Sequence, residues 1–198
     1  MTLFAAQSTW IALVPALPLL AAIVTALLGA RTLKRLSHWP VIVATAASFL
    51  ISLMLLIDAS KTEHDGEHHV DQAKTVTLWN WATVEDAQPA NDWDLVINVA
   101  LRADGLTVVM LTMVTFISLL VTIFSSGYMH DDRGYWRFFS YLGLFIFSMT
   151  MLVSVNNFLL LFVFWEAVGM CSYLLIGFWY QKPEAAAAGK KAFLVNRV

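Results

Sequence analysis

The chain alternates between long apolar runs and shorter polar connections. Five runs are long and apolar enough to cross a membrane, at residues 10–30, 39–57, 106–128, 138–155 and 158–180. A membrane-spanning helix needs about 20 mostly apolar residues, so each run predicts one transmembrane helix. A sixth run begins near residue 185 and reaches the end of the chain at Val198, which is too short to cross a bilayer. We therefore expect the chain to be a truncated piece of a longer helix bundle.

Composition supports a membrane protein. Hydrophobic residues make up 59% of the chain and charged residues 13%, about half of the roughly 25% charge found in soluble domains. The net charge of −2 gives no reason to expect nucleic-acid binding, and the single Cys171 allows no internal disulfide. The first apolar run is preceded by no basic residue and followed by Arg31, Lys34 and Arg35. This order is typical of a retained membrane anchor rather than of a cleaved signal peptide.

Basic residues are unevenly divided between the two sets of connections. Loops on one side carry eight and loops on the other side carry three, Lys61, Lys74 and Arg102. The eight are Arg31, Lys34, Arg35, Arg133, Arg137, Lys182, Lys190 and Lys191. Cytoplasmic loops are enriched in Lys and Arg, so the richer side is predicted to be cytoplasmic. The N-terminus and residues 58–104 then face outside.

Residues 58–104 form a polar region between two hydrophobic parts, 1–57 and 105–198. Apolar residues alternate with polar ones at Val76 and Leu78, and again at Leu95, Ile97, Val99 and Leu101. Gln88, Pro89 and Asn91 separate the two segments, so we expect a β-hairpin on the outer membrane face. His64, His68 and His69 lie among acidic residues earlier in this region. Their order matches no defined metal site, and we interpret them as part of a solvated loop.

Glu166 is the strongest candidate for chemistry, because it lies eight residues into the fifth run and 14 before residue 180. That spacing places it about 21 Å from the cytoplasmic end. A carboxylate at such depth costs several kcal/mol unless it is paired or faces water, and such residues are usually functional. A structural Glu bonded between helices is the alternative. Gly169, Tyr173 and Gly177 follow Glu166 at helical spacing, and we interpret these glycines as a packing face.

Arg197 is predicted to lie at the same depth as Glu166. The midpoint of positions 166 and 197 falls in the turn around residues 181–183, so an antiparallel hairpin brings the two level. Spacing does not determine whether they face each other. Arginine does not release its proton, but it favours the ionised form of a neighbouring acid; a purely structural cation is the alternative. Lys190 and Lys191 either anchor the cytoplasmic end or supply protons to Glu166.

Other polar residues predict structure rather than chemistry. Hydroxyl groups recur along one face of the third run at Thr115, Ser118, Thr122 and Ser125, where they are expected to bond to helix carbonyls. Asn156 and Asn157 fit a tight outer turn. The chain has no phosphate loop, dinucleotide fingerprint, cysteine cluster or paired haem histidines. We expect no cofactor and no metal on this chain, so that any redox centre belongs to other chains.

A resemblance to a known family is carried by two parts of the sequence. The first comprises Gly127-Tyr128-Met129, Tyr135, Arg137-Phe138-Phe139 and Leu144-Phe145. The second, more specific part runs from Asn157-Phe158-Leu159-Leu160 through Trp165-Glu166-Ala167-Val168-Gly169-Met170-Cys171-Ser172-Tyr173 to Trp179, followed by Lys190-Lys191-Ala192-Phe193 and Asn196-Arg197. These residues resemble the antiporter-like membrane subunits of respiratory complex I, the NADH–quinone oxidoreductase, of the chain L type. The resemblance is dense from about residue 104 onward and weak before it.

The resemblance implies an all-α, antiporter-like bundle that translocates protons in a bacterial inner membrane. Glu166 would pair with a lysine on a later helix, which is expected beyond Val198. The partners would be other membrane subunits of complex I, and NADH, FMN, iron–sulfur clusters and quinone are expected on partner subunits. Two alternatives stay open: a subunit of a cation/proton antiporter or membrane-bound hydrogenase, which share the Trp165-Glu166 core, or a truncated chain with a structural role only.

Overall fold

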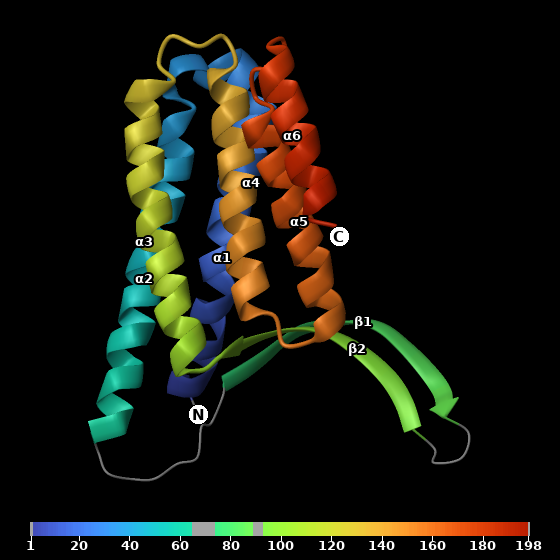
Figure 1. Ribbon diagram of the computed structural model, residues 1–198. Coiled ribbons are helices and arrows are strands. Elements are labelled where there is room, and N and C mark those ends of the chain that lie inside the picture. The colour runs from blue at the N-terminus through green and yellow to red at the C-terminus, as the bar shows by residue number, and fades with distance from the viewer. Residues whose placement is uncertain (1, 65–73, 89–92, 198) are drawn as a thin grey trace.

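The structure, a computed structural model, describes residues 2–64, 74–88 and 93–197, and it is mostly helical (Figure 1). Within these ranges the α-helices are α1 (Thr2–Leu28), α2 (His38–His64), α3 (Gly105–Tyr128), α4 (Tyr135–Ser154), α5 (Phe158–Ile176) and α6 (Pro183–Val195). A π-helical turn, Gly29–Leu33, and a 3-10 turn, Lys34–Leu36, join α1 to α2. Five helices in the described ranges are long and apolar enough to span a membrane, which confirms a polytopic, multi-pass membrane fold.

Several helix ends differ from the predicted span ends because hydropathy marks where the membrane ends, not where a hydrogen-bonded helix ends. The first helix begins at Thr2, before the span that starts at Trp10 as predicted, and it contains Pro15 and Pro18. The second continues to His64. The fifth ends at Ile176 instead of residue 180. The sixth starts at Pro183, where a ring with no N–H fits the first helical turn.

The bundle is held together by apolar packing and by hydroxyl groups that reach neighbouring helices. Val41, Phe139 and Ile146 are fully buried in one core, where α1, α2 and α4 meet. Between helices, Ser48 Oγ donates to the carbonyl of Val14 at 2.9 Å and Ser140 Oγ donates to that of Ala22 at 3.2 Å. These bonds satisfy polar groups that lipid cannot satisfy.

The hydroxyl face of α3 behaves as predicted. Thr115 donates to the carbonyl of Leu111 at 2.7 Å and Thr122 donates to that of Ser118 at 2.6 Å. Both threonines are fully buried. This face therefore serves packing.

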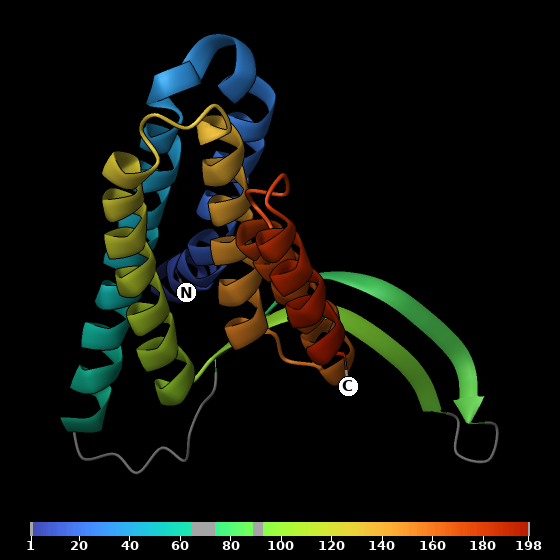
Figure 2. The ribbon, with the colours of Figure 1, turned by 45° about the horizontal axis from the view of Figure 1, so that its top comes forward.

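The predicted hairpin is confirmed. Strand β1 (Lys74–Gln88) pairs antiparallel with β2 (Trp93–Ala103), and irregularities shift the register at three places. The paired strands extend beyond the side of the bundle where α5 and α6 lie (Figures 1 and 2). At its base, Leu101 pairs with Val155, and Asn156 N donates to the carbonyl of Ala100 at 3.1 Å.

The connections of the bundle lie at two ends (Figure 1). The α1–α2, α3–α4 and α5–α6 connections lie at one end, which we call the basic end. The hairpin, the N-terminus and the α4–α5 connection lie at the opposite end. Of the histidine cluster, His68 and His69 lie outside the described residues, and so does the side chain of His64.

Candidate functional site at the centre of the α5–α6 hairpin

Glu166 lies near the middle of α5, eight residues after Phe158 and ten before Ile176. At about 1.5 Å per residue, the carboxylate is roughly 15 Å from the end of the helix. This distance is shorter than the predicted one because α5 ends before residue 180. The side chain is 27% exposed, so it is half-buried at the edge of the bundle rather than enclosed.

Arg197 faces Glu166. Its Nη2 lies 3.1 Å from Oε2 of the carboxylate, and its side chain is 51% exposed. The guanidinium also lies 4.0 Å from the centre of the Phe193 ring, which adds a cation–π contact. Helix α5 and the segment after α6 thus bring the two charges together. Their equal depth was predicted from the sequence, but their mutual orientation was not.

The glycines near the pair allow α5 and α6 to approach closely. A methyl group at Gly169 would lie 2.6 Å from Nδ2 of Asn196. A methyl group at Gly189 of α6 would lie 3.3 Å from both the nitrogen of Gly177 and the carbonyl oxygen of Tyr173. The glycine stripe of α5 therefore packs against α6, as predicted.

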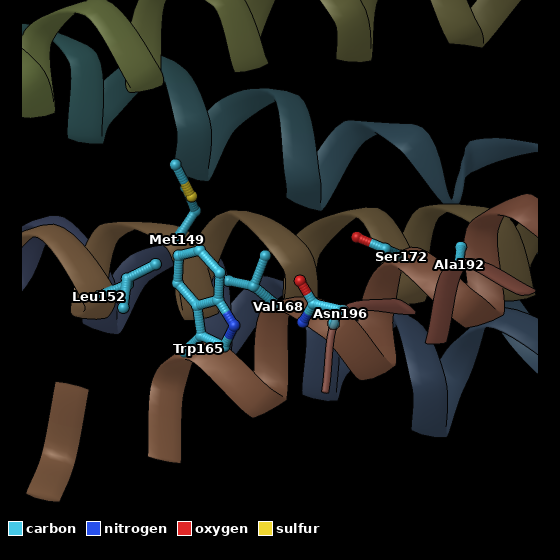
Figure 3. Close-up of a pocket in the computed structure, with 8 residues that line it drawn as sticks. Met149, Leu152, Trp165, Val168, Ser172, Ala192 and Asn196 are labelled. Atoms are coloured by element: carbon cyan, nitrogen blue, oxygen red, sulfur yellow. The ribbon is translucent and has the colours of Figure 1, made fainter. Parts of the chain in front are cut away.

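A cavity of about 330 Å³ opens beside the ion pair, between α4, α5 and α6. Its lining is mostly apolar: Met149, Leu152, Trp165, Val168, Gly169, Ser172, Ala192 and Asn196. Figure 3 shows Trp165 of α5 near Met149 and Leu152 of α4, with Asn196, the residue directly after α6, beside Val168. Sequence reasoning missed Trp165 and Asn196 as site residues, although each directly neighbours a member of the pair. Their side chains, with Ser172, supply the polar groups of the cavity.

Lys190 and Lys191 are not brought into this arrangement. Both are exposed on α6, and neither makes an ion pair or hydrogen bond with any residue in the described ranges. Arg197 is the predicted site cation that contacts Glu166. Among all residues that the structure describes, no three His, Cys, Asp or Glu side chains lie close enough together to hold a metal ion.

Contacts at the basic end hold the start of α6. Trp179 Nε1 donates to Oδ2 of Asp132 at 2.8 Å, and the backbone N–H of Gly134 donates to Oδ1 at 2.7 Å. These two bonds, with the charge of Arg137, hold the pKa of Asp132 below its usual range. Arg137 also donates to the carbonyl of Phe178 at 3.3 Å. The α3–α4 loop thereby fixes the turn that leads into α6.

Asn157 fixes the opposite end of α5. Its Oδ1 accepts from the N–H of Leu160 at 2.8 Å, and its Nδ2 donates to the carbonyl of Asn98 in β2 at 2.7 Å. The first bond is an N-cap, which satisfies a backbone donor at the start of the helix. One side chain thus joins the hairpin to the helix that carries Glu166, in the tight turn predicted for Asn156 and Asn157.

Two family descriptions match this sequence. The model described as "NADH-Ubiquinone oxidoreductase (complex I), chain 5 N-terminus" matches residues 91–139. The model described as "NADH:quinone oxidoreductase/Mrp antiporter, TM" matches residues 155–198. The second match includes the whole α5–α6 hairpin and its ion pair.

Curated relatives agree with these descriptions. The chain is 40% identical to "NADH-quinone oxidoreductase subunit L" of Neisseria meningitidis serogroup B over 91% of its own length and 25% of the relative. It is 45% identical to the subunit L of Rickettsia bellii over 92% of its length and 26% of that protein. It is 39% identical to "NAD(P)H-quinone oxidoreductase subunit 5, chloroplastic" of Fagopyrum esculentum over 97% of its length and 24% of that protein. The chain spans about a quarter of the length of these relatives.

Proposed function

Because this chain belongs to the family of antiporter-like membrane subunits called L or 5 in NADH–quinone oxidoreductases, we propose that it takes part in proton translocation through Glu166. In this proposal the chain carries no redox centre. NADH, FMN, iron–sulfur clusters and quinone belong to partner subunits, and quinone reduction supplies the energy. The partners are other membrane subunits of the same complex.

The observation that carries the proposal is the 3.1 Å contact between Glu166, near the middle of α5, and Arg197, in the segment directly after α6. Opposite charges about 4 Å apart attract by about 4 kcal/mol at an effective dielectric near 20, and the half-exposed guanidinium lowers this value. A carboxylate that loses such a partner in apolar surroundings becomes easier to protonate. Movement of a cation toward or away from Glu166 would therefore make it release or accept a proton.

Arg197 would act by its charge alone, because a guanidinium keeps its proton. Protons would reach Glu166 through Lys190 or Lys191, or through water in the cavity lined by Ser172 and Asn196. The resemblance adds a lysine on a later helix as the mobile cation. Water in this mostly apolar cavity would be held at the polar groups of Ser172, Asn196 and Trp165, because a bound water needs polar partners.

The proposal also sets the orientation of the chain in a bacterial cell membrane. The basic end would face the cytoplasm, since short cytoplasmic loops are rich in Lys and Arg. The N-terminus and the hairpin would face outside. Reaction of an impermeant lysine reagent with intact cells, compared with inverted vesicles, tests this orientation at Lys182 of the α5–α6 turn.

The test of function is Glu166→Gln in the assembled complex. We expect proton uptake per quinone reduced to fall well below wild type in inverted vesicles, because the amide cannot exchange a proton. Glu184→Gln is the matched control, since Glu184 is an exposed carboxylate at the start of α6. Pumping by Glu166→Gln at the level of this control would show the proposal to be wrong.

A second candidate function is a subunit of a cation/proton antiporter. It is favoured by one observation, the reference to Mrp antiporters in the description that matches residues 155–198. This function predicts Na⁺-dependent proton exchange in vesicles without NADH. Proton exchange that depends on Na⁺ and is unaffected by NADH would favour the antiporter. Proton pumping that requires NADH would favour a subunit of NADH–quinone oxidoreductase.

A further inference from the structure

A second cavity, of about 340 Å³, lies at the basic end, where the end of α1 meets the α3–α4 loop. Cationic side chains from both segments line it: Lys34 and Arg35 from the 3-10 turn, and Arg133 from the loop. His130 and Trp136 also contribute to the lining. Residues about 100 positions apart in the sequence thus converge on one basic cavity.

The three cations have no acidic partner among the described residues. Lys34, Arg35 and Arg133 are exposed and make no ion pair within the parts of the chain that the structure covers. Two acids share the lining, Asp131 and Asp132. The carboxylate of Asp132 is already bonded to Trp179 and Gly134. With three cationic and two acidic side chains in the lining, the cavity keeps an excess of one positive charge that is available to a ligand.

The backbone around the cations is held in an unusual shape. Lys34 has a φ of 40°, a positive value at a residue other than glycine, which costs about 1–3 kcal/mol and tends to persist at functional sites. The π-helical turn Gly29–Leu33 directly precedes it, and π-turns are also frequent at such sites. A methyl group at Gly29 would lie 2.7 Å from Cβ of Trp136. Glycine therefore allows the end of α1 to pack against Trp136 on this side of the cavity.

Hydrogen bonds hold the turn that carries Lys34 and Arg35 in place. Ser37 Oγ donates to the carbonyl of Lys34 at 2.7 Å. Nδ1 of His38 lies 3.1 Å from the carbonyl oxygen of Arg35 and 2.9 Å from the hydroxyl of Tyr135 at the start of α4. The turn that carries Lys34 and Arg35 is therefore held in place before any ligand binds, which lowers the entropic cost of binding.

The cavity lies at the level where the apolar spans end. The first span ends at Leu36 and the fourth begins at Tyr135. Leu28, Leu36 and Trp39, which flank the basic turns in the sequence, are large exposed apolar residues. A ligand with a phosphate in the cavity and acyl chains on such apolar surface would match both features.

From this geometry we propose that the cavity binds the phosphate of an anionic phospholipid headgroup, such as that of phosphatidylglycerol. Arg35 and Arg133 would contact the phosphate oxygens, because a guanidinium presents paired donors that match a phosphate. Lys34 would add a third positive charge. This cavity shares no lining residue with the cavity beside Glu166 and Arg197.

The test is native mass spectrometry of the intact complex taken from lipid nanodiscs of mixed phosphatidylcholine and phosphatidylglycerol. Arg133→Gln should reduce the retained phosphatidylglycerol by about fivefold, the effect of roughly one basic residue near an anionic membrane. Arg31→Gln is the matched control, since Arg31 is exposed on the preceding turn and does not line the cavity. Arg133→Lys should restore part of the binding.

Three outcomes would overturn the proposal. Equal loss in Arg133→Gln and Arg31→Gln would mean that lipid is attracted by the general charge of this end. Displacement of phosphatidylglycerol from wild type by millimolar inorganic phosphate, with a phosphate adduct lost in Arg133→Gln, would identify free phosphate as the ligand. Retention of an acidic peptide from a neighbouring subunit, in place of lipid, would identify a protein contact.

Discussion

Helices α4 and α5 are antiparallel neighbours of almost equal length, 20 and 19 residues, but they play different parts. α4 buries nine residues and α5 buries three. The buried Ser148, Thr150 and Ser154 of α4 donate to carbonyls of their own helix, as Ser148 does to Leu144 and Ser154 does to Thr150, at 2.9 and 2.8 Å. The polar group of α5, Glu166, is satisfied by Arg197 from the segment after α6.

The two helices therefore serve different purposes: α4 mainly packs the bundle, and α5 carries the candidate site. Because these three hydroxyls are satisfied within α4, the helix can be buried there, and α4 packs between α1 and α5. Helix α5, in contrast, depends on another segment for the cation that pairs with its carboxylate. Phe158 and Phe162 of α5 are 85% and 59% exposed, so this helix also offers an apolar face to lipid or to other helices. The site lies on the less buried of the two helices.

The largest expected effect compares the same substitution in both helices. Phe139 of α4 is fully buried, whereas Phe162 of α5 is 59% exposed. Phe139→Ala should lower the free energy of unfolding by about 3–5 kcal/mol, because it leaves a cavity in the core. Phe162→Ala should change it by no more than about 0.5 kcal/mol. Denaturant unfolding in detergent measures both, and equal effects would contradict the contrast between the helices.

The second prediction concerns the charged pair. Arg197→Gln leaves Glu166 without its partner and should destabilise the chain by about 1–3 kcal/mol, below the value for a fully buried pair because the arginine is half-exposed. The double variant Glu166→Gln/Arg197→Gln should regain part of that loss, since no lone charge remains. A double-mutant cycle of unfolding free energies measures the coupling. Additive effects would show that the contact contributes nothing to stability.

The third prediction tests how α5 begins. Asn157 caps α5 with its side chain, whereas Gly134 at the start of α4 provides no such cap. Asn157→Ala should cost about 1 kcal/mol through the lost cap. It should also speed hydrogen exchange at the base of β2, where the bond to Asn98 is lost. Asn156→Ala is the control, because that residue bonds the hairpin through its backbone N–H.

The smallest expected effect is a pH dependence at the basic end. Hydrogen bonds hold the pKa of Asp132 below its usual range in the folded chain, so they stabilise the fold above the unfolded pKa of about 3.9. That contribution is lost as pH falls through the lower, folded pKa. The protection of residues 177–182 against hydrogen exchange, relative to the intrinsic exchange rate at each pH, should therefore fall when pH drops below about 4.

Two variants check this pH effect. Trp179→Phe removes the main donor to Asp132 and should weaken the pH dependence of exchange in the turn. Asp131→Asn alters the neighbouring acid, which makes no hydrogen bond with Trp179 in the described part of the chain, and should leave the dependence as in wild type. An unchanged dependence in Trp179→Phe would contradict the role given to this bond.

Much of the fold was predictable because a membrane imposes few solutions. Residue runs of sufficient apolar length predicted five helices, and alternation from Leu95 to Leu101 and at Val76 and Leu78 predicted the hairpin. The helix ends were less predictable, as at Ile176, because a helix continues or stops according to backbone hydrogen bonds and capping. The register shifts between the strands, such as the one between Thr77 and Trp79, were not predictable from the alternation of apolar and polar residues.

The candidate site was predictable in part. Glu166 stood out because a charge inside an apolar run is costly, and the spacing around the turn placed Arg197 at the same depth. Trp165 and Asn196 gave no comparable signal, since an aromatic residue and an amide are common at helix surfaces. Lys190 and Lys191 were named from their charge, and their part in proton transfer stays a prediction.

The sequence by itself determined the class of the protein, the number of spans in the described chain, the grouping of basic residues at one end and the placement of Glu166 inside the fifth span, because length and hydropathy act locally along the chain. Only the tertiary structure decided that Arg197 faces Glu166, that Gly189 meets Gly177, and that Lys34 and Arg133 line one cavity. Those contacts depend on how each helix is rotated about its axis and how closely its neighbours approach. Rotation and approach follow from packing across distant segments, as where Gly169 leaves room for Asn196.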